Sequence, residues 1–220
     1  MITSQKLKSF ANISHGFSTK DNHDLSNIKK SEIRSARQVH GTKIAIIHKH
    51  VNKNLPDADG LVTKLKNLSL AVKTADCVPL LFYDPVNKII GVAHSGWKGT
   101  LGNITKETIE AMKILGAREK NLLVVLGPHI KKCCYNIDKE REILFRNNFP
   151  SNTSLISYRN GMAYLNLSQA ITYQLKNEGI SQNNIEIIPL CTAGRPDLFF
   201  SYRRDKNNAG RMINFICQTN

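Results

Sequence analysis

Short apolar runs, rich in isoleucine and valine, recur along the whole chain and are separated by polar turns. Runs of about four to eight such residues are typical of strands in a folded core. The pattern predicts strands at 43–48, 69–73, 78–83, 88–93, 121–127, 185–190, 197–202 and 211–217. Asp84 and Pro85 then open the turn that joins two of these strands into a hairpin.

Helical spacing of apolar residues is rarer. Residues 103–115 place their apolar side chains on one face, and Gly116 follows as a stop signal. Asp138 and Ser168 are expected to cap two further helices, the second of which ends at Gly179. Because strands and helices do not alternate strictly, the order favours an α+β fold with mixed sheets over a doubly wound fold.

The chain has 220 residues, which suits one domain spanning 1–220. No apolar run reaches the roughly 20 residues that cross a bilayer, and the first residues lack the apolar stretch of a secretory signal. We therefore expect a cytoplasmic protein with no membrane partner. The cysteines number five, an odd count, and none form a CxxC pair, which argues against a disulfide framework and a zinc finger.

The formal net charge is +14, which by itself suggests a nucleic acid or another anionic surface as partner. Lysine, asparagine and isoleucine are all abundant, however, and all three have A/T-rich codons, so a coding bias explains much of the charge. The basic residues are also scattered, without an arginine-rich block. We expect no nucleic-acid partner, although the positive field would favour small anionic substrates.

Reactive residues interrupt the apolar runs in three segments, at 37–41, 74–79 and 92–100. These segments place three potential ligands at strand ends or in the turns that follow: His40, Cys77 and His94. Their wide spacing carries no local metal signature, but two imidazoles and a thiolate brought together from three loops would bind zinc and leave a fourth position open. The same donors could take copper.

Other readings of these residues stay open. His40, Cys77 and His94 could be a turn histidine, a core thiol and a buried histidine, or Cys77 could be the nucleophile of a hydrolase with His94 as its base. Asp76 could orient a ligand or carry a proton, or it could simply cap a turn. The adjacent Arg203 and Arg204 suit phosphate or carboxylate recognition, or an exposed basic turn.

Taken together, these segments resemble the YfiH-type laccase-domain family, also called polyphenol oxidases and described as zinc-dependent purine nucleoside phosphorylases. The matching pieces span nearly the whole chain in the same order: HisGlyPheSerThr (15–19), GlnValHisGly (38–41), AlaAspGlyLeuVal (58–62), ThrAlaAspCysValPro (74–79), AlaHisSerGlyTrpLysGly (93–99), GlyProHisIle (127–130), CysTyr (134–135), CysThr (191–192), PheSerTyrArgArgAsp (200–205) and GlyArg (210–211).

The resemblance implies a four-layer α/β/β/α sandwich with mixed sheets and a metal bound by His40, Cys77 and His94. It implies phosphorolysis of adenosine, inosine, guanosine and methylthioadenosine, with phosphate as co-substrate and adenosine deamination as a second reaction. Copper-dependent phenol oxidation and a role in editing peptidoglycan precursors are the alternative activities attached to the family.

For the deamination, we expect water activated by the metal to attack C6, with Asp76 as a proton carrier. Phosphate would be held by Lys98, Arg203 or Arg204, among which the sequence does not choose. Lys98 stands where the family usually has arginine, and the segment between His15 and His40 is shorter than in most relatives.

Three further residues bear on the metal. His129 stands where a cysteine is usual, and His129 or Cys191 as a fourth ligand would turn an open site into a structural one. Cys133 is extra beside Cys134, and we interpret it as structural. Among the histidines only His48 and His50 are close in sequence, so a multicopper centre is not expected and any phenol oxidation should be weak.

Overall fold

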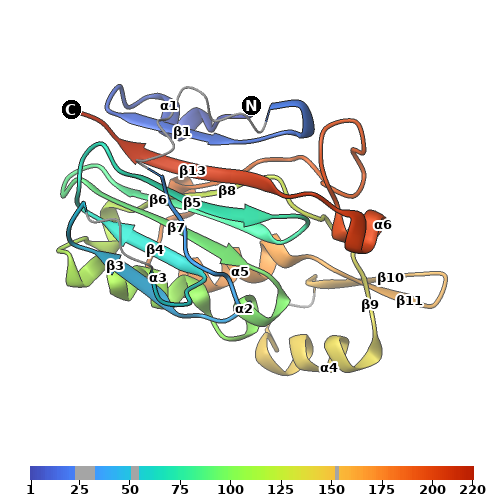
Figure 1. The fold of residues 1–220 in the computed structure, drawn as a ribbon. Coiled ribbons are helices and arrows are strands. Elements are labelled where there is room, and N and C mark those ends of the chain that lie inside the picture. Colours follow the sequence, from blue (N-terminus) through green and yellow to red (C-terminus); the bar gives the residue numbers. More distant parts are fainter. Residues whose placement is uncertain (23–32, 51–54, 152–153) are drawn as a thin grey trace.

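The computed structural model describes residues 1–22, 33–50, 55–151 and 154–220, which form two stacked β-sheets with helices on one outer face (Figure 1). The larger sheet has six strands, in the order β12 (Ile185–Ile187), β8 (Leu123–Leu126), β6 (Val78–Asp84), β7 (Ile89–Ser95), β4 (Gly60–Thr63) and β3 (Ile44–Ile47). The smaller has four strands, in the order β1 (Ile13–Phe17), β13 (Met212–Gln218), β5 (Ser69–Thr74) and β2 (Ile33–Arg34).

Both sheets are mixed. In the larger one, β3 runs parallel to β4 and β12 runs parallel to β8, while β6 is antiparallel to both of its neighbours. In the smaller one, β2 is parallel to β5 and the other pairs are antiparallel. The α+β class with mixed sheets that the sequence predicted is therefore confirmed.

The helices are α1 (Gln5–Lys8), α2 (Trp97–Leu101), α3 (Ile104–Ile114), α4 (Lys139–Asn148), α5 (Leu167–Asn177) and α6 (Tyr202–Asp205). Figure 1 shows α3 and α5 on the outer face of the larger sheet and the short α1 beside β1. Leu7 of α1 belongs to the core between the two sheets, so α1 packs at their edge. A third sheet, in the order β10 (Ile156–Arg159), β11 (Met162–Leu165) and β9 (Asn136–Ile137), lies next to α4.

Strand β6 shows why the apolar runs are continuous. All of its residues are buried. Leu80 and Phe82 belong to the core shared with α3 and α5, whereas Leu81 and Tyr83 belong to the core between the two sheets. Because both faces of the strand are covered, no alternation of polar residues survives in its sequence.

Local signals placed several helix ends correctly. Asp138 caps α4 by accepting a hydrogen bond from the Arg141 amide at 2.8 Å. Gly116 and Gly179 follow α3 and α5 with φ of 101° and 85°, a left-handed conformation that glycine adopts without strain.

Two expectations about secondary structure were wrong. Helix α5 is capped by Asn166 and not by Ser168, because the Asn166 side chain reaches the Gln169 amide at 3.2 Å. Residues 197–202 form no strand. The amides of Leu198 and Phe199 bond to the Arg195 carbonyl in a turn, which leads directly into α6.

Residues 23–32, part of the shortened segment between His15 and His40, lie outside the described residues. Within the part of the chain that the structure describes, no helix is both long enough and apolar enough to cross a membrane.

Candidate metal centre

His40, Cys77 and His94 lie together although they are far apart in sequence. One ligand atom from each side chain lies within 4.8 Å of the others. Cys77 occupies the turn between β5 and β6, His94 lies near the end of β7, and His40 precedes β3. The structure thus brings together the two imidazoles and the thiol that the sequence singled out.

The backbone around this group is specialised. His40 and Asp76 both have positive φ, of 60° and 90°, which is uncommon for residues other than glycine. Gly96 faces the group, because a Cβ at that position would lie 2.9 Å from Cys77 Sγ. A side chain at position 96 would therefore collide with the sulfur, so the close approach requires glycine.

Asp59 supports the group from behind and was not identified as a site residue from the sequence. Its Oδ1 lies 2.8 Å from His94 Nδ1, and the exposed fractions of the two residues are 0% and 3%. The same carboxylate accepts hydrogen bonds from the amides of His40 at 3.0 Å and Gly41 at 2.7 Å. It therefore fixes the His94 ring through Nδ1 and holds the His40 loop, as carboxylates behind metal-ligating histidines do.

Burial raises the pKa of the Asp59 carboxyl, but the His94 imidazole and the backbone N–H groups outweigh burial and hold that pKa below its usual range. Burial likewise opposes ionisation of the Cys77 thiol, yet hydrogen bonds with His40 and His94 lower its pKa to about 7. Burial disfavours a charged His94, whereas Asp59 and Cys77 raise its pKa to about 9. The site favours a thiolate, which is the form that binds metal.

Two cavities meet at this group. One, which we call the aromatic cavity, has a volume of about 320 Å³ and is lined by His40, Ala75, Asp76, Cys77, Trp97, Ile130, Tyr135, Arg141, Leu167, Tyr202, Arg203 and Lys206. The other, the basic cavity, has a volume of about 630 Å³ and is lined by Ala36, Arg37, Gln38, His40, Lys73, Thr74, Ala75, Cys77, His94, Tyr202 and Arg211. His40 and Cys77 belong to both walls.

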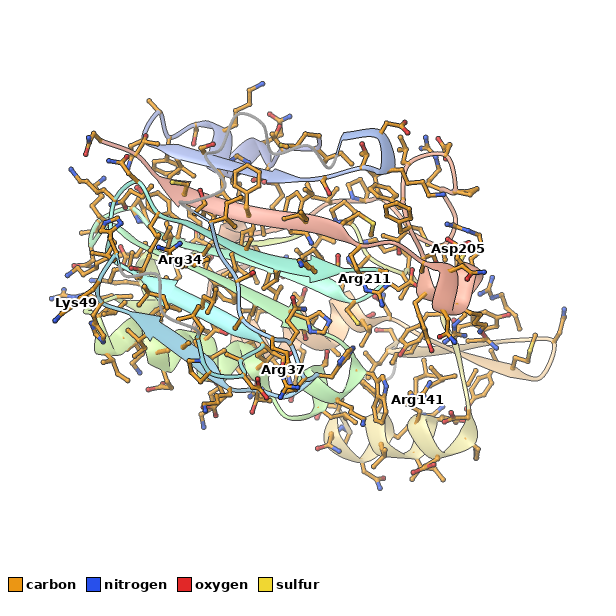
Figure 2. All side chains as sticks on the ribbon, viewed as in Figure 1. Arg34, Arg37, Lys49, Arg141, Asp205 and Arg211 are labelled. Atoms are coloured by element: carbon orange, nitrogen blue, oxygen red, sulfur yellow. The ribbon has the colours of Figure 1, made fainter. Side chains whose placement is uncertain are left out.

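Cations pack against the rings of the aromatic cavity. The Arg141 guanidinium lies 4.7 Å from the centre of the Trp97 ring, and that of Arg203 lies 5.1 Å from the Tyr135 ring. Figure 2 shows Arg141 on the side of α4 that faces the sheets and Arg211 beside α6. Sequence reasoning missed Arg141 and Arg211, because single basic residues in a chain of this charge carry no local signal.

The three expected phosphate ligands are placed differently. Arg203 lines the aromatic cavity. Lys98 lines neither cavity, and its Nζ lies 5.5 Å from the Trp97 ring centre. Arg204 also lies outside both cavities, since its guanidinium bonds to the Phe199 carbonyl at 2.9 Å and pairs with Asp205.

Asp76 lines the aromatic cavity, but its carboxylate is already engaged. It accepts hydrogen bonds from Thr192 Oγ1 at 2.6 Å, Ser201 Oγ at 2.9 Å and the Arg203 amide at 2.6 Å. These bonds tie the turn before β6 to the start of α6.

The alternative fourth ligands lie elsewhere. His129 Nδ1 bonds to the Gly127 carbonyl at 2.7 Å, and Cys191 clusters with Cys133 and Cys134. Among the described residues, no further histidine, cysteine or carboxylate offers a ligand atom within 4.8 Å of all three ligand atoms of the group around Cys77, and Asp59 contacts only the far nitrogen of the His94 ring. The donors of this group therefore fit a metal with an open position, of the kind found at catalytic zinc sites.

The chain matches the family described as multi-copper polyphenol oxidoreductase laccase over residues 19–219. It is 38% identical over 165 residues to purine nucleoside phosphorylase YlmD of Bacillus subtilis, covering 74% of this chain and 59% of that protein. It is 37% identical over 195 residues to a purine nucleoside phosphorylase of Clostridium acetobutylicum, covering 88% of this chain and 79% of the relative. Against the human purine nucleoside phosphorylase it matches, it covers only 38% of the relative's length.

Solved structures share the fold. The chain superimposes on YlmD from Geobacillus stearothermophilus with a TM-score of 0.87 at 27% identity, covering 96% of this chain and 93% of the other. It superimposes on YfiH from Bacillus licheniformis with a TM-score of 0.85 at 29% identity, covering 94% and 93%. From the extent of these matches, the chain belongs to the multi-copper polyphenol oxidoreductase laccase family.

Proposed function

We propose that this chain is a zinc-dependent purine nucleoside phosphorylase that acts on adenosine, inosine, guanosine and methylthioadenosine and also deaminates adenosine. The relatives named as purine nucleoside phosphorylases support the class of reaction. The observation that carries the proposal is the meeting of the aromatic and basic cavities at His40 and Cys77.

The aromatic cavity suits a purine. Trp97 and Tyr135 offer flat apolar surfaces on which a base can stack, and Ile130 and Leu167 add apolar wall. Arg203 and Lys206 at the same cavity can donate hydrogen bonds to the ring or the sugar. With the base held there, its ribose reaches the junction of the two cavities.

The basic cavity suits phosphate. Lys73 and Arg211 line it, and a second arginine, Arg37, is paired with Asp57. In phosphorolysis, a phosphate oxygen forms a bond to the anomeric carbon while the bond from that carbon to the purine nitrogen breaks and its electron pair leaves with the base. Phosphate approaching from the basic cavity would meet the sugar on the side opposite the base.

The metal would be held by His40, Cys77 and His94, with Asp59 orienting His94. Bound zinc supplies a positive charge that polarises a substrate oxygen or a water molecule without redox chemistry. Deamination, in which water replaces the C6 amino group and ammonia leaves, requires adenosine in the reverse orientation, with C6 toward Cys77. Because the aromatic and basic cavities both border His40 and Cys77, we propose that adenosine can bind in the orientation for phosphorolysis or in the one for deamination.

For Asp76 we propose a positioning role in place of proton transfer. Its carboxylate oxygens already accept three hydrogen bonds, and these hold Arg203 and α6 at the cavity wall. Arg203 remains a proposed substrate ligand, whereas the placement of Lys98 and Arg204 supports no phosphate contact.

The experiment is to purify the protein without added metal, measure its metal content, and assay base release from inosine with and without phosphate. Removal of the metal with a chelator should abolish base release, and zinc should restore it. Full activity in metal-free protein would contradict the proposal. Loading the same preparation with copper tests phenol oxidation, which we expect to be weak and dependent on added copper.

A cysteine hydrolase is the second candidate, because Asp59, His94 and Cys77 are arranged as an acid, a base and a nucleophile. The second imidazole, His40, has no role in such a triad but is needed to bind a metal. A stable alkyl adduct on Cys77 that abolishes activity in metal-free protein would favour the hydrolase. Protection of Cys77 from alkylation by zinc would favour the phosphorylase.

A further inference from the structure

A second group of thiols lies apart from the metal centre. Among the described residues, the sulfur atoms of Cys133, Cys134 and Cys191 all lie within 4.8 Å of one another, and Cys133 Sγ is 3.6 Å from Cys134 Sγ. Cys133 is exposed and the other two are half-buried. Nothing in the proposed phosphorylase reaction uses them.

The backbone holds the three sulfurs in place from two directions. The turn that carries Cys133 and Cys134 is closed by the bond from the Cys134 amide to the Lys131 carbonyl at 2.9 Å. Arg159 clamps the outside of the turn by donating to the carbonyls of Lys132 and Cys133, both at 2.9 Å. The turn therefore holds the side chains of Cys133 and Cys134 close together. In a strand, two neighbouring side chains would point to opposite faces.

Cys191 comes from the other side, after β12. Its sulfur accepts hydrogen bonds from the amides of Lys131 and Gly194, both at 3.4 Å. Two N–H groups directed at one sulfur favour a thiolate there. Gly194 lies against the cluster, because a Cβ at that position would contact the sulfurs of Cys191 at 3.5 Å and Cys134 at 3.7 Å.

We infer that Cys133, Cys134 and Cys191 form a second metal site, which binds one Cu(I) ion through three thiolates. Thiolates are soft ligands that select Cu(I), zinc or iron–sulfur clusters. Structural zinc is almost always bound by four protein ligands, and the described residues place no fourth histidine, cysteine or carboxylate with these three. Cu(I) is stable with three thiolates in a plane.

A disulfide explains the cluster less well. A disulfide uses two sulfurs, whereas here three converge, and a bond between the adjacent Cys133 and Cys134 would strain the turn. The exposed Cys133 also gives an ion a way in from solvent, which a metal site needs.

The site lies behind the wall of the aromatic cavity. Ile130 and Tyr135, at either end of the thiol-bearing turn, line that cavity. Thr192, next to Cys191, bonds to Asp76. An ion bound here would join the 131–134 turn to the 191–194 turn and so stiffen this wall of the aromatic cavity. This role would be separate from the chemistry at Cys77.

The test uses the full chain carrying its zinc, reduced and kept under nitrogen, and titrated with Cu(I) in competition with a chromophoric Cu(I) chelator. The wild-type chain should withdraw one Cu(I) ion, and so should Cys77→Ser, which removes the thiol of the other group. Cys133→Ser and Cys191→Ser should withdraw clearly less Cu(I) at the same chelator concentration, because only two thiolates remain. The X-ray absorption spectrum of the bound copper should show only sulfur neighbours.

Cys133→Ser is the decisive variant, because an exposed residue can be changed to serine with little effect on the fold, and thermal melting checks that it is folded. Equal Cu(I) uptake by wild type and Cys133→Ser would overturn the inference. So would uptake that disappears in Cys77→Ser, a second zinc ion that Cu(I) does not displace, or a disulfide to Cys191 in protein isolated without reductant.

Discussion

Asp59 Oδ1 lies 2.8 Å from His94 Nδ1, and both residues are almost completely buried. The same carboxylate also accepts hydrogen bonds from the backbone amides of His40 and Gly41. One acidic residue therefore fixes two of the three candidate ligands, His94 through its ring and His40 through its backbone. Removal of the Asp59 charge should therefore lower the affinity for the metal more than it affects the rest of the fold.

Asp59→Asn is expected to weaken zinc binding by about 10–100-fold, the usual effect of losing a carboxylate behind a ligating histidine. Competition with a zinc chelator measures this directly. The matched control is Asp57→Asn, two residues away, where the exposed carboxylate pairs with Arg37 and not with a ligand. Equal zinc affinity in Asp59→Asn and wild type would show that His94 needs no orienting partner.

Gly96→Ala is expected to lower zinc affinity and phosphorolysis while the protein stays folded. The added Cβ would lie 2.9 Å from Cys77 Sγ, which must then move away from the imidazoles. Gly41→Ala is the control, since its Cβ would meet Asp59 Oδ2 at 3.6 Å, an ordinary contact. Zinc content per chain and thermal melting, measured on both variants, separate loss of the metal from loss of the fold.

Arg203→Gln and Arg204→Gln should differ although the residues are adjacent. Arg203 lines the aromatic cavity, and its guanidinium bond to the Asn136 carbonyl is exposed, so its loss should raise the KM for nucleoside and lower the melting temperature less than loss of Arg204 does. Arg204 bonds to the backbone carbonyls of Ala193 and Phe199 in partly buried positions, so its loss should lower the free energy of unfolding by about 1–3 kcal/mol. Steady-state kinetics and urea denaturation of both variants check this, and a KM effect confined to Arg204→Gln would reverse the assignment.

The sequence predicted those elements whose signals are local. Strand β6 is buried on both faces, so its residues from Val78 to Tyr83 form a continuous apolar run. Helix α3 is buried on one face, so its apolar residues recur at helical spacing. Both patterns can be recognised within a short stretch of sequence. Residues 197–202 read as a strand for the same reason but are not one. The Phe199 side chain is buried, but its amide bonds to the Arg195 carbonyl in a turn and not to a neighbouring strand.

The site was only partly predictable because it is assembled from distant segments. His40, Cys77 and His94 stand out as reactive residues at strand ends, and the resemblance of the surrounding motifs joined them. The role of Asp59 depends on which side chain it meets across the fold, and no spacing in the sequence reveals that Asp59 and not Asp57 faces His94. The placement of Arg204 outside both cavities is likewise a consequence of how α6 is oriented.

Acid should destabilise the protein through His129. Burial and the charge of Lys131 lower the pKa of His129 to about 3, against the Gly127 carbonyl, which raises it. An unfolded chain binds this proton near pH 6.5, so the stabilisation is fully present above that pH and is lost as the pH falls. The loss is at most about 1.4 kcal/mol per pH unit.

Urea denaturation over a series of pH values should show this slope, and His129→Leu should reduce it whatever its effect on stability at neutral pH. His48→Gln, at an exposed histidine, is the control and should leave the slope unchanged. An unchanged slope in His129→Leu would mean that other buried groups cause the acid sensitivity.

Asp76→Asn distinguishes positioning from proton transfer. The carboxylate holds Thr192, Ser201 and the Arg203 amide, so its loss should displace α6 and raise the KM for nucleoside more than it lowers kcat. Ser201→Ala leaves the carboxylate in place but removes one of the same bonds, together with the cap that Ser201 Oγ gives the Arg204 amide of α6, and it should produce a weaker change of the same kind. A proton carrier would behave differently. Its loss would lower kcat at unchanged KM and remove a limb of the pH–rate profile, and Ser201→Ala would not reproduce the effect. Kinetics of both variants across pH, with zinc content measured in each, therefore decide between the two roles of Asp76.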